Sequence, residues 1–208
     1  DGLLPNLRVL MQAMRYASTF NFSVWLRPQE ISLTNDGVAH DGEVATRLGL
    51  PTVPVCAETI AISNIILLAK ETGVRVHLCR ISSAEGLTMV RAAKQQGLPM
   101  TCDVTINHLH LSDMDIGFFD SNCHLMPPLR SSSDRDALRN GLLDGTIDAI
   151  CSDHAPVDED AKLLPFGQSE IGATGVELLL PLTLKWGNEM RLPLLQVLAK
   201  ITSEPAEI

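Results

Sequence analysis

The chain has 208 residues, of which 45% are hydrophobic and 20% charged, the composition of an ordinary globular protein. Its net charge of −9 argues against a nucleic acid or an anionic membrane as partner, because both require clustered lysine and arginine. No apolar run of about 18 residues is present, and residues 1–10 do not read as a signal peptide. Five scattered cysteines do not suggest a disulfide framework, so we expect a cytoplasmic protein.

Helical and strand-like segments alternate from the beginning of the chain. Residues 5–19 have apolar side chains at helical spacing, and residues 22–26 are rich in β-forming residues. A second helix is predicted over residues 57–72, where Gly73 provides a stop signal. The apolar run at residues 74–79 then predicts a strand.

The same alternation continues to the end of the chain. Ser82 or Ser83 can cap a helix over residues 84–96 that Gly97 ends, and residues 100–104 predict a strand. The later elements, in order, are a helix opening at Ser131–Ser133, a strand over residues 147–151, and helices near residues 174–187 and 193–201.

Strands that alternate with helices indicate parallel βαβ units in an α/β fold. An open doubly wound sheet and a (β/α)₈ barrel are both compatible with this pattern, but four units are too few to close a barrel. The final residues, 202–208, read as a helix start with Ser203 as cap and Pro205 in the first turn. We therefore expect residues 1–208 to form one partial barrel domain of a longer protein.

In both arrangements the functional site lies at the carboxyl ends of the strands. Asp153 follows the strand at 147–151, where it can bind a metal, act as a general base, or cap the next turn. His154 beside it is expected to be structural. His77 lies within a strand and is expected to be a hydrogen-bonded core histidine, while His108 and His110 form either a chelating pair or a half-exposed loop pair.

Several sequence blocks occur in an order and spacing that identify a family. They are VAHDGEVATRLGLP at 38–51, VHLCRISSAEGL at 76–87, MPPLRS at 126–131, DAICSDHAP at 148–156, PFG at 165–167 and GVELLLPL at 175–182. Together they resemble dihydroorotase of the longer type that accompanies aspartate transcarbamoylase, a member of the amidohydrolase superfamily. The resemblance implies the second half of a zinc-bearing (β/α)₈ TIM-type barrel, with the first strands and their His-x-His motif outside this chain.

The resemblance also shows where this sequence departs from the family. Arg27 and Arg80 occupy positions at which the family has metal-binding histidines, although a register shifted by one would place Leu26 at the first. Met126 and Val157 replace an asparagine and a histidine that contact the substrate, whereas Asp153 matches the family's metal ligand and general base.

These substitutions oppose metal binding and catalysis. Zinc needs imidazole, thiolate or carboxylate donors, whereas arginine has no acceptor lone pair and remains protonated. Met126 and Val157 cannot form side-chain hydrogen bonds to a polar substrate. We therefore expect Asp153 to pair with Arg80 or Arg27, and we expect no cofactor.

Three functions remain open at this point. The first is an inactive dihydroorotase-like protein of pyrimidine biosynthesis that supports assembly of the aspartate transcarbamoylase catalytic chain, in an oligomer. The second is an active zinc-dependent dihydroorotase or cyclic amidohydrolase that interconverts carbamoyl-aspartate and dihydroorotate, with zinc bound by first-half ligands and Asp153. The third is a protein whose two arginines bind a new anionic ligand.

Overall fold

The computed structural model describes residues 6–34 and 36–208. Its centre is a parallel sheet with the strand order β1-β4-β5-β6, so the strands of this sheet lie side by side in the order of the chain. These strands are β1 (Ser23–Leu26), β4 (Arg75–Leu78), β5 (Met100–Thr105) and β6 (Ala149–Cys151). Each of the four predicted strands is therefore confirmed to within two residues at either end.

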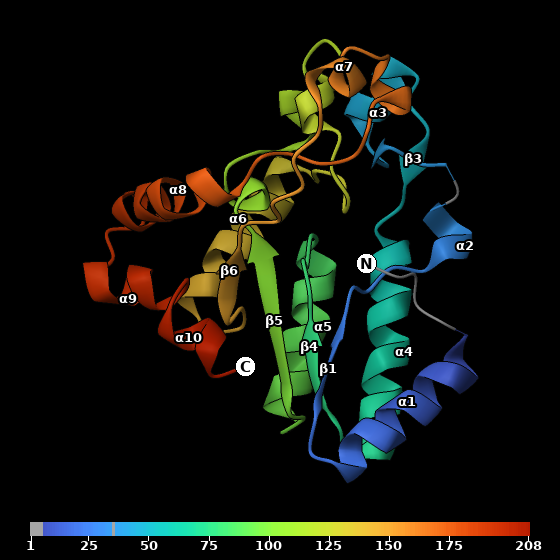
Figure 1. The fold of residues 1–208 in the computed structure, drawn as a ribbon, viewed down its shortest axis with the longest axis vertical. Helices are drawn as coiled ribbons and strands as arrows, with labels where there is room; N and C mark the ends of the chain where they lie inside the picture. The colour runs from blue at the N-terminus through green and yellow to red at the C-terminus, as the bar shows by residue number, and fades with distance from the viewer. Residues whose placement is uncertain (1–5, 35) are drawn as a thin grey trace.

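Long helices cover one face of this sheet, as Figure 1 shows for α4 and α5. The predicted helices are confirmed with small shifts at their ends. Helix α1 begins at Leu7, after its N-cap residue Asn6, and residue 5 of the predicted range lies outside the described residues. They are α1 (Leu7–Thr19), α4 (Cys56–Thr72), α5 (Ala84–Gln95), α6 (Ser132–Leu143), α8 (Val176–Glu189), α9 (Leu194–Ala199) and α10 (Ser203–Ala206).

The predicted helix-end residues are confirmed at four of five positions, one of which is Gly97 at φ 80° just after α5. Ser83 accepts a hydrogen bond from Gly86 N, and Ser131 forms a capping box with Asp134. Gly73 ends α4 at φ 66°, a conformation that costs glycine little. The expectation for Ser203 is wrong by one residue, because Thr202 precedes α10 and Ser203 is its first residue.

The two faces of the sheet differ in chemistry. Val76, Leu78, Val104 and Ile150 point toward the helices and belong to one large apolar cluster. The opposite face is polar, because alternate side chains of a strand point to opposite sides. Trp25, His77 and Thr101 lie in register across it, and Trp25 is 55% exposed.

Shorter elements that the sequence patterns did not predict gather beyond the carboxyl ends of the strands, at the top of Figure 1. They are α2 (Ile31–Thr34), α3 (Glu43–Leu48), α7 (Glu159–Lys162), the two-stranded sheet of β2 (Ala39–His40) and β3 (Thr52–Val53), and the 3₁₀ turns η1 (Asn107–Leu109), η2 (Asp113–Ile116), η3 (Ser121–Cys123) and η4 (Phe166–Gln168). A second apolar cluster that includes Val38, Leu125 and Phe166 lies under them. These loops form the surroundings of the strand ends, which in such folds hold the functional site.

Candidate functional site at the strand ends

Arg80 and Asp153 meet at the carboxyl ends of β4 and β6. Arg80 Nη1 donates to Asp153 Oδ1 at 2.6 Å, and the two side chains are 13% and 15% exposed. The predicted pairing of Asp153 with an arginine is therefore confirmed for Arg80. At this distance and burial the bond is a charge-assisted one, which is stronger than a neutral hydrogen bond.

Both residues of this ion pair have left-handed backbone conformations, at φ 61° for Arg80 and φ 47° for Asp153. Aspartate tolerates this region, but arginine adopts it only where surrounding contacts enforce it. Asp103 in β5 provides such a contact, because its Oδ1 accepts from Arg80 N at 2.7 Å and its carbonyl accepts from Ile81 N at 3.0 Å. Asp103 thus fixes the turn that aims the Arg80 side chain.

Arg27 follows β1 and lies beside the same ion pair. Burial is the largest cause that lowers the pKa of its guanidinium; repulsion from Arg80 lowers it further and Asp153 opposes both. Within residues 6–34 and 36–208, the Arg27 side chain forms no hydrogen bond or ion pair. The side chain is therefore a half-buried cation near a second cation, and the carboxylate that raises its pKa, Asp153, is engaged by Arg80.

A narrow hollow separates these groups from the loops above them. Its lining includes Arg27, Gln29, Glu58, Arg80, Pro127 and Arg130. Three guanidinium groups thus face one carboxyl group across a space that admits little more than one water-sized group. Gln29, Glu58 and Arg130 were not identified as site residues from the sequence, although Arg130 lies within the MPPLRS block and Glu58 is an acid in an apolar helix.

Glu58 and Arg130 are buried together in the floor of this hollow. The Glu58 carboxyl group accepts hydrogen bonds from Ser82 and Ser83, including Ser83 Oγ at 3.2 Å, and burial raises its pKa. Arg130 donates to Ser82 Oγ at 3.2 Å and to the Val53 carbonyl at 2.7 Å. This network ties α4 to the turn after β4 and so supports the backbone beside Arg80.

The two substituted substrate positions lie on the loops around the strand ends. Met126 is half-buried and its Sδ accepts from Gln29 Nε2 at 3.3 Å. Val157 is also half-buried, and a side chain at Gly172 would come within 3.1 Å of it. Neither side chain can donate a hydrogen bond to a ligand. The loss of substrate contacts at these two positions remains a prediction from the resemblance.

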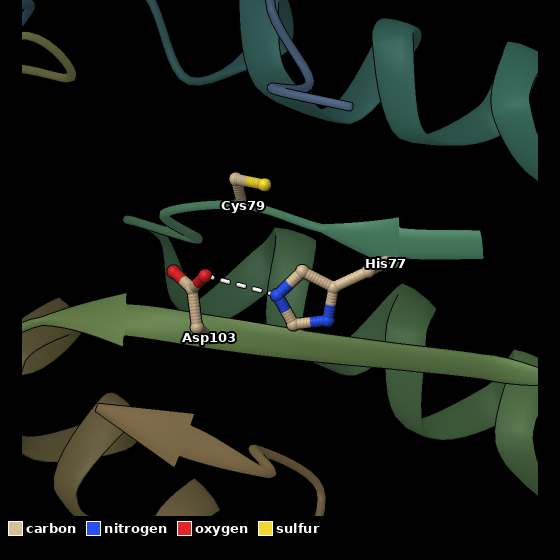
Figure 2. A group of neighbouring side chains, drawn as sticks. All are labelled: His77, Cys79 and Asp103. Carbon is tan, nitrogen blue, oxygen red and sulfur yellow. Dashed lines mark hydrogen bonds and ion pairs between the residues drawn. The ribbon is translucent and has the colours of Figure 1, made fainter. Parts of the chain in front are cut away.

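His77, Cys79 and Asp103 form the one group of metal-type donors that the described residues bring together, with ligand atoms within 4.8 Å of one another (Figure 2). His77 is a hydrogen-bonded core histidine, as expected. Its Nε2 pairs with Asp103 Oδ2 at 2.9 Å and its Nδ1 with Thr101 Oγ1 at 2.8 Å. Burial raises the pKa of the Cys79 thiol to about 11, so the thiol is protonated at neutral pH. The His77 and Asp103 side chains thus have hydrogen-bond partners without a metal, and Asp103 also supports the turn at Arg80.

The arrangement at the strand ends does not fit the zinc site that the resemblance implies. Arg80 and Arg27 place cations where two imidazoles would be required, and the Asp153 carboxylate is bound to Arg80. Of the three positions that the resemblance relates to metal ligands, 27, 80 and 153, only Asp153 offers a zinc donor in the described part of the chain.

The remaining histidines have structural contacts. His108 is buried in η1, bonds to Thr105 Oγ1 at 2.7 Å, and has a pKa lowered to about 4 by burial. His110 is half-buried and bonds separately to the Leu182 carbonyl at 2.9 Å, so the chelating-pair hypothesis is wrong. His154 Nδ1 accepts from Gly175 N at 3.1 Å at the start of α8, which confirms its structural role.

Comparison with known proteins supports the resemblance to dihydroorotases. Residues 6–86 match the model of the family described as "Dihydro-orotase-like". A "Dihydroorotase-like protein" of Pseudomonas putida is 43% identical over 203 residues, which are 98% of this chain and 48% of that protein. A "Dihydroorotase" of Geobacillus sp. (strain WCH70) is 40% identical over 209 residues, covering 100% of this chain and 49% of that protein.

Solved structures establish the fold. The L-hydantoinase of Arthrobacter aurescens superposes with a TM-score of 0.86 at 22% identity, over 100% of this chain and 49% of the other. The dihydroorotase of Saccharomyces cerevisiae, in complex with 5-fluoroorotic acid, superposes with a TM-score of 0.76 at 14% identity. The match covers 96% of this chain and 53% of the yeast protein. These are amidohydrolase TIM-barrel enzymes, and the chain spans about half their length. The four consecutive parallel strands are thus half of such a barrel, and nearly the whole chain is similar in sequence to dihydroorotase-like proteins about twice its length.

Proposed function

We propose that this chain is part of a dihydroorotase-like protein of pyrimidine biosynthesis that has lost catalysis and supports the assembly of aspartate transcarbamoylase. The proposal rests on one observation: Arg80, at a metal-ligand position by resemblance, pairs with Asp153 at 2.6 Å. The carboxylate that would serve as metal ligand and general base is therefore neutralised by a side chain instead of a metal.

The competing function is an active zinc-dependent dihydroorotase, with zinc bound by first-half ligands and Asp153. It would require Asp153 to leave Arg80 and a dication to approach Arg27 and Arg80. The guanidinium groups stay protonated, so they would repel a bound zinc ion. This repulsion destabilises the competing arrangement and is absent when Asp153 pairs with Arg80.

The proposal also covers the setting in which the protein works. It includes a cytoplasmic location, which the five free cysteines support. As a separate finding, the helices of residues 6–34 and 36–208 include none that could span a membrane. A scaffold role implies an oligomer with the aspartate transcarbamoylase catalytic chain.

The test of catalysis uses the full-length protein. We expect no stoichiometric zinc by elemental analysis and no cyclisation of carbamoyl-aspartate. A matched variant, Arg27→His with Arg80→His, restores two imidazoles and should bind more zinc than the parent protein. Stoichiometric zinc in the parent, together with turnover of about 1 per second or faster, would show that the protein is an enzyme.

The test of the scaffold role is separate. We expect the full-length protein to co-elute with the aspartate transcarbamoylase catalytic chain of the same organism in size-exclusion chromatography, and to raise its transcarbamoylase activity. Separate elution with unchanged activity would refute the scaffold role, even if zinc and turnover are absent.

A further inference from the structure

Four large apolar side chains gather on the loops that lie farthest beyond the strand ends. They are Phe118, Phe119, Leu163 and Leu164, which are 92%, 38%, 82% and 49% exposed. The two phenylalanines lie between η2 and η3, and the two leucines follow α7. Ser121 Oγ donates to the Lys162 carbonyl and Lys162 Nζ donates to the Ser121 carbonyl, so the two segments lie together at the top of Figure 1. We name these four residues the apolar tip.

The apolar tip is supported by loops of this chain and does not lie along an edge of the sheet. The edge strands are β1 and β6. The segment after β6 crosses away from its strand, because Phe166 packs with Val38 in the second apolar cluster and Gly172 N donates to the His124 carbonyl at 3.1 Å. The exposure of the apolar tip is therefore a property of these loops, separate from the unpaired edges of the sheet.

The backbone beside Phe118 is strained. Phe119 has φ 64°, a left-handed conformation that a bulky residue adopts only where surrounding contacts enforce it. The Phe118 and Phe119 rings lie edge to face, with their centroids 5.6 Å apart. Single exposed apolar residues are common on protein surfaces, whereas a group that includes two aromatic rings is typical of an interaction surface.

The surroundings of the apolar tip are acidic. Residues 113–124 and 158–164 together contain six aspartates and glutamates and one lysine. The acids at 158–160 are exposed, whereas the Lys162 ammonium group donates to two backbone carbonyls. Like charges would repel a second copy of this surface, and a basic surface would be attracted to it. The apolar tip therefore fits a partner whose apolar pocket is bordered by lysine and arginine.

We infer that the apolar tip is the surface on which a partner protein docks, and that the partner receives Phe118 in an apolar pocket with a basic rim. The inference rests on the proposed function, because it assigns this contact to the aspartate transcarbamoylase catalytic chain. Phe118 is the anchor, since aromatic side chains that fill a pocket supply much of the binding energy of an interface. The acidic border steers the encounter and raises the rate of association.

The first measurement is hydroxyl-radical footprinting with mass spectrometry. It uses the full-length protein, alone and with the aspartate transcarbamoylase catalytic chain of the same organism. We expect Phe118 and Leu163 to be oxidised readily in the protein alone and to be protected several-fold in the complex. Protection of Phe118 in the protein alone would show that the rest of the protein covers the apolar tip, and would overturn the inference.

The second measurement is the affinity of the full-length protein for the same catalytic chain, by titration calorimetry. Phe118→Ser should weaken binding about 10-fold or more, and its exposure means that the fold should not change. Leu67→Ser is the matched control, because Leu67 is also an exposed apolar residue, 61% exposed, but lies on α4; it should bind like the parent. Asp160→Lys should slow association several-fold at low salt and less at high salt, because salt screens the rim charges.

The outcomes separate the inference from the proposed function. Equal affinities of the parent and Phe118→Ser would overturn the inference and leave the scaffold role standing. An altered oligomeric state of Phe118→Ser with unchanged affinity would assign the apolar tip to contacts between copies of the protein, and would also overturn the inference. Absence of binding by the parent would refute the scaffold role and the inference together.

Discussion

The ion pair of Arg80 and Asp153 can be tested by replacing the carboxylate with an amide. Asp153→Asn keeps the shape of the side chain and tolerates the left-handed backbone at φ 47°, so strain should not change. What is lost is the charge that faces Arg80 Nη1 at 2.6 Å. The variant therefore isolates the electrostatic part of the contact.

The expected cost follows from the burial of the pair. Exposed ion pairs contribute less than about 1 kcal/mol, and breaking a fully buried pair costs about 3–5 kcal/mol. The side chains here are 13% and 15% exposed, and Arg80 makes a further interaction that keeps it from being left unpartnered. We therefore expect Asp153→Asn to lower the free energy of unfolding by about 1–2 kcal/mol.

The measurement is urea unfolding of the full-length protein at pH 7, for Asp153→Asn, Arg80→Gln and the double variant. The double-mutant cycle should give a coupling energy of about 1 kcal/mol or more. The control pair is Arg135 and Asp136, which lie 3.0 Å apart and are 29% and 61% exposed; its cycle should give below about 0.5 kcal/mol. Equal coupling energies in the two cycles would refute the reasoning that burial makes the Arg80–Asp153 contact strong.

Three further outcomes are expected in the full-length protein. Burial lowers the pKa of His108 to about 4, so as pH decreases from about 6.5 His108 is protonated in the unfolded chain before the folded one, and the free energy of unfolding should fall. In urea unfolding, His108→Gln should reduce this fall, and an unchanged dependence of stability on pH would contradict the prediction. Burial raises the pKa of Glu58, so stability should decrease as pH rises above its ordinary 4.5, and thermal unfolding should show a smaller decrease for Glu58→Gln. A side chain at Gly187 would clash with Val197, so Gly187→Ala should lower the free energy of unfolding by about 1–3 kcal/mol. Adding Val197→Ala should restore part of this loss, and no restoration would show that the clash is not its cause.

The local elements could be predicted from the sequence because they depend on neighbours along the chain. The alternation of apolar runs located β1, β4, β5 and β6, and serine and glycine signals located the ends of α4, α5 and α6. The short elements at the strand ends escaped prediction because two-residue strands and 3₁₀ turns have no periodicity that a pattern can reveal.

The sequence by itself also determined what the site lacks. With Arg27 and Arg80 at ligand positions by resemblance, no fold of these residues could supply imidazoles there. The sequence left two possible partners for Asp153, and only the tertiary structure decided between them. Arg80 and Asp153 are 73 residues apart, and the parallel order β4-β5-β6 brings their strand ends to one edge of the sheet.

The tertiary structure alone assembled the rest of the site. Glu58 and Arg130 come from a helix and a loop that no local pattern relates, and the hollow they share with Arg27 exists only because α4 and the Pro127 turn pack over the strand ends. It also gave His108 and His110 separate hydrogen-bond partners, with His108 in a buried 3₁₀ turn. Residue types are fixed by the sequence, whereas the distances and burial that set their chemistry arise from long-range packing.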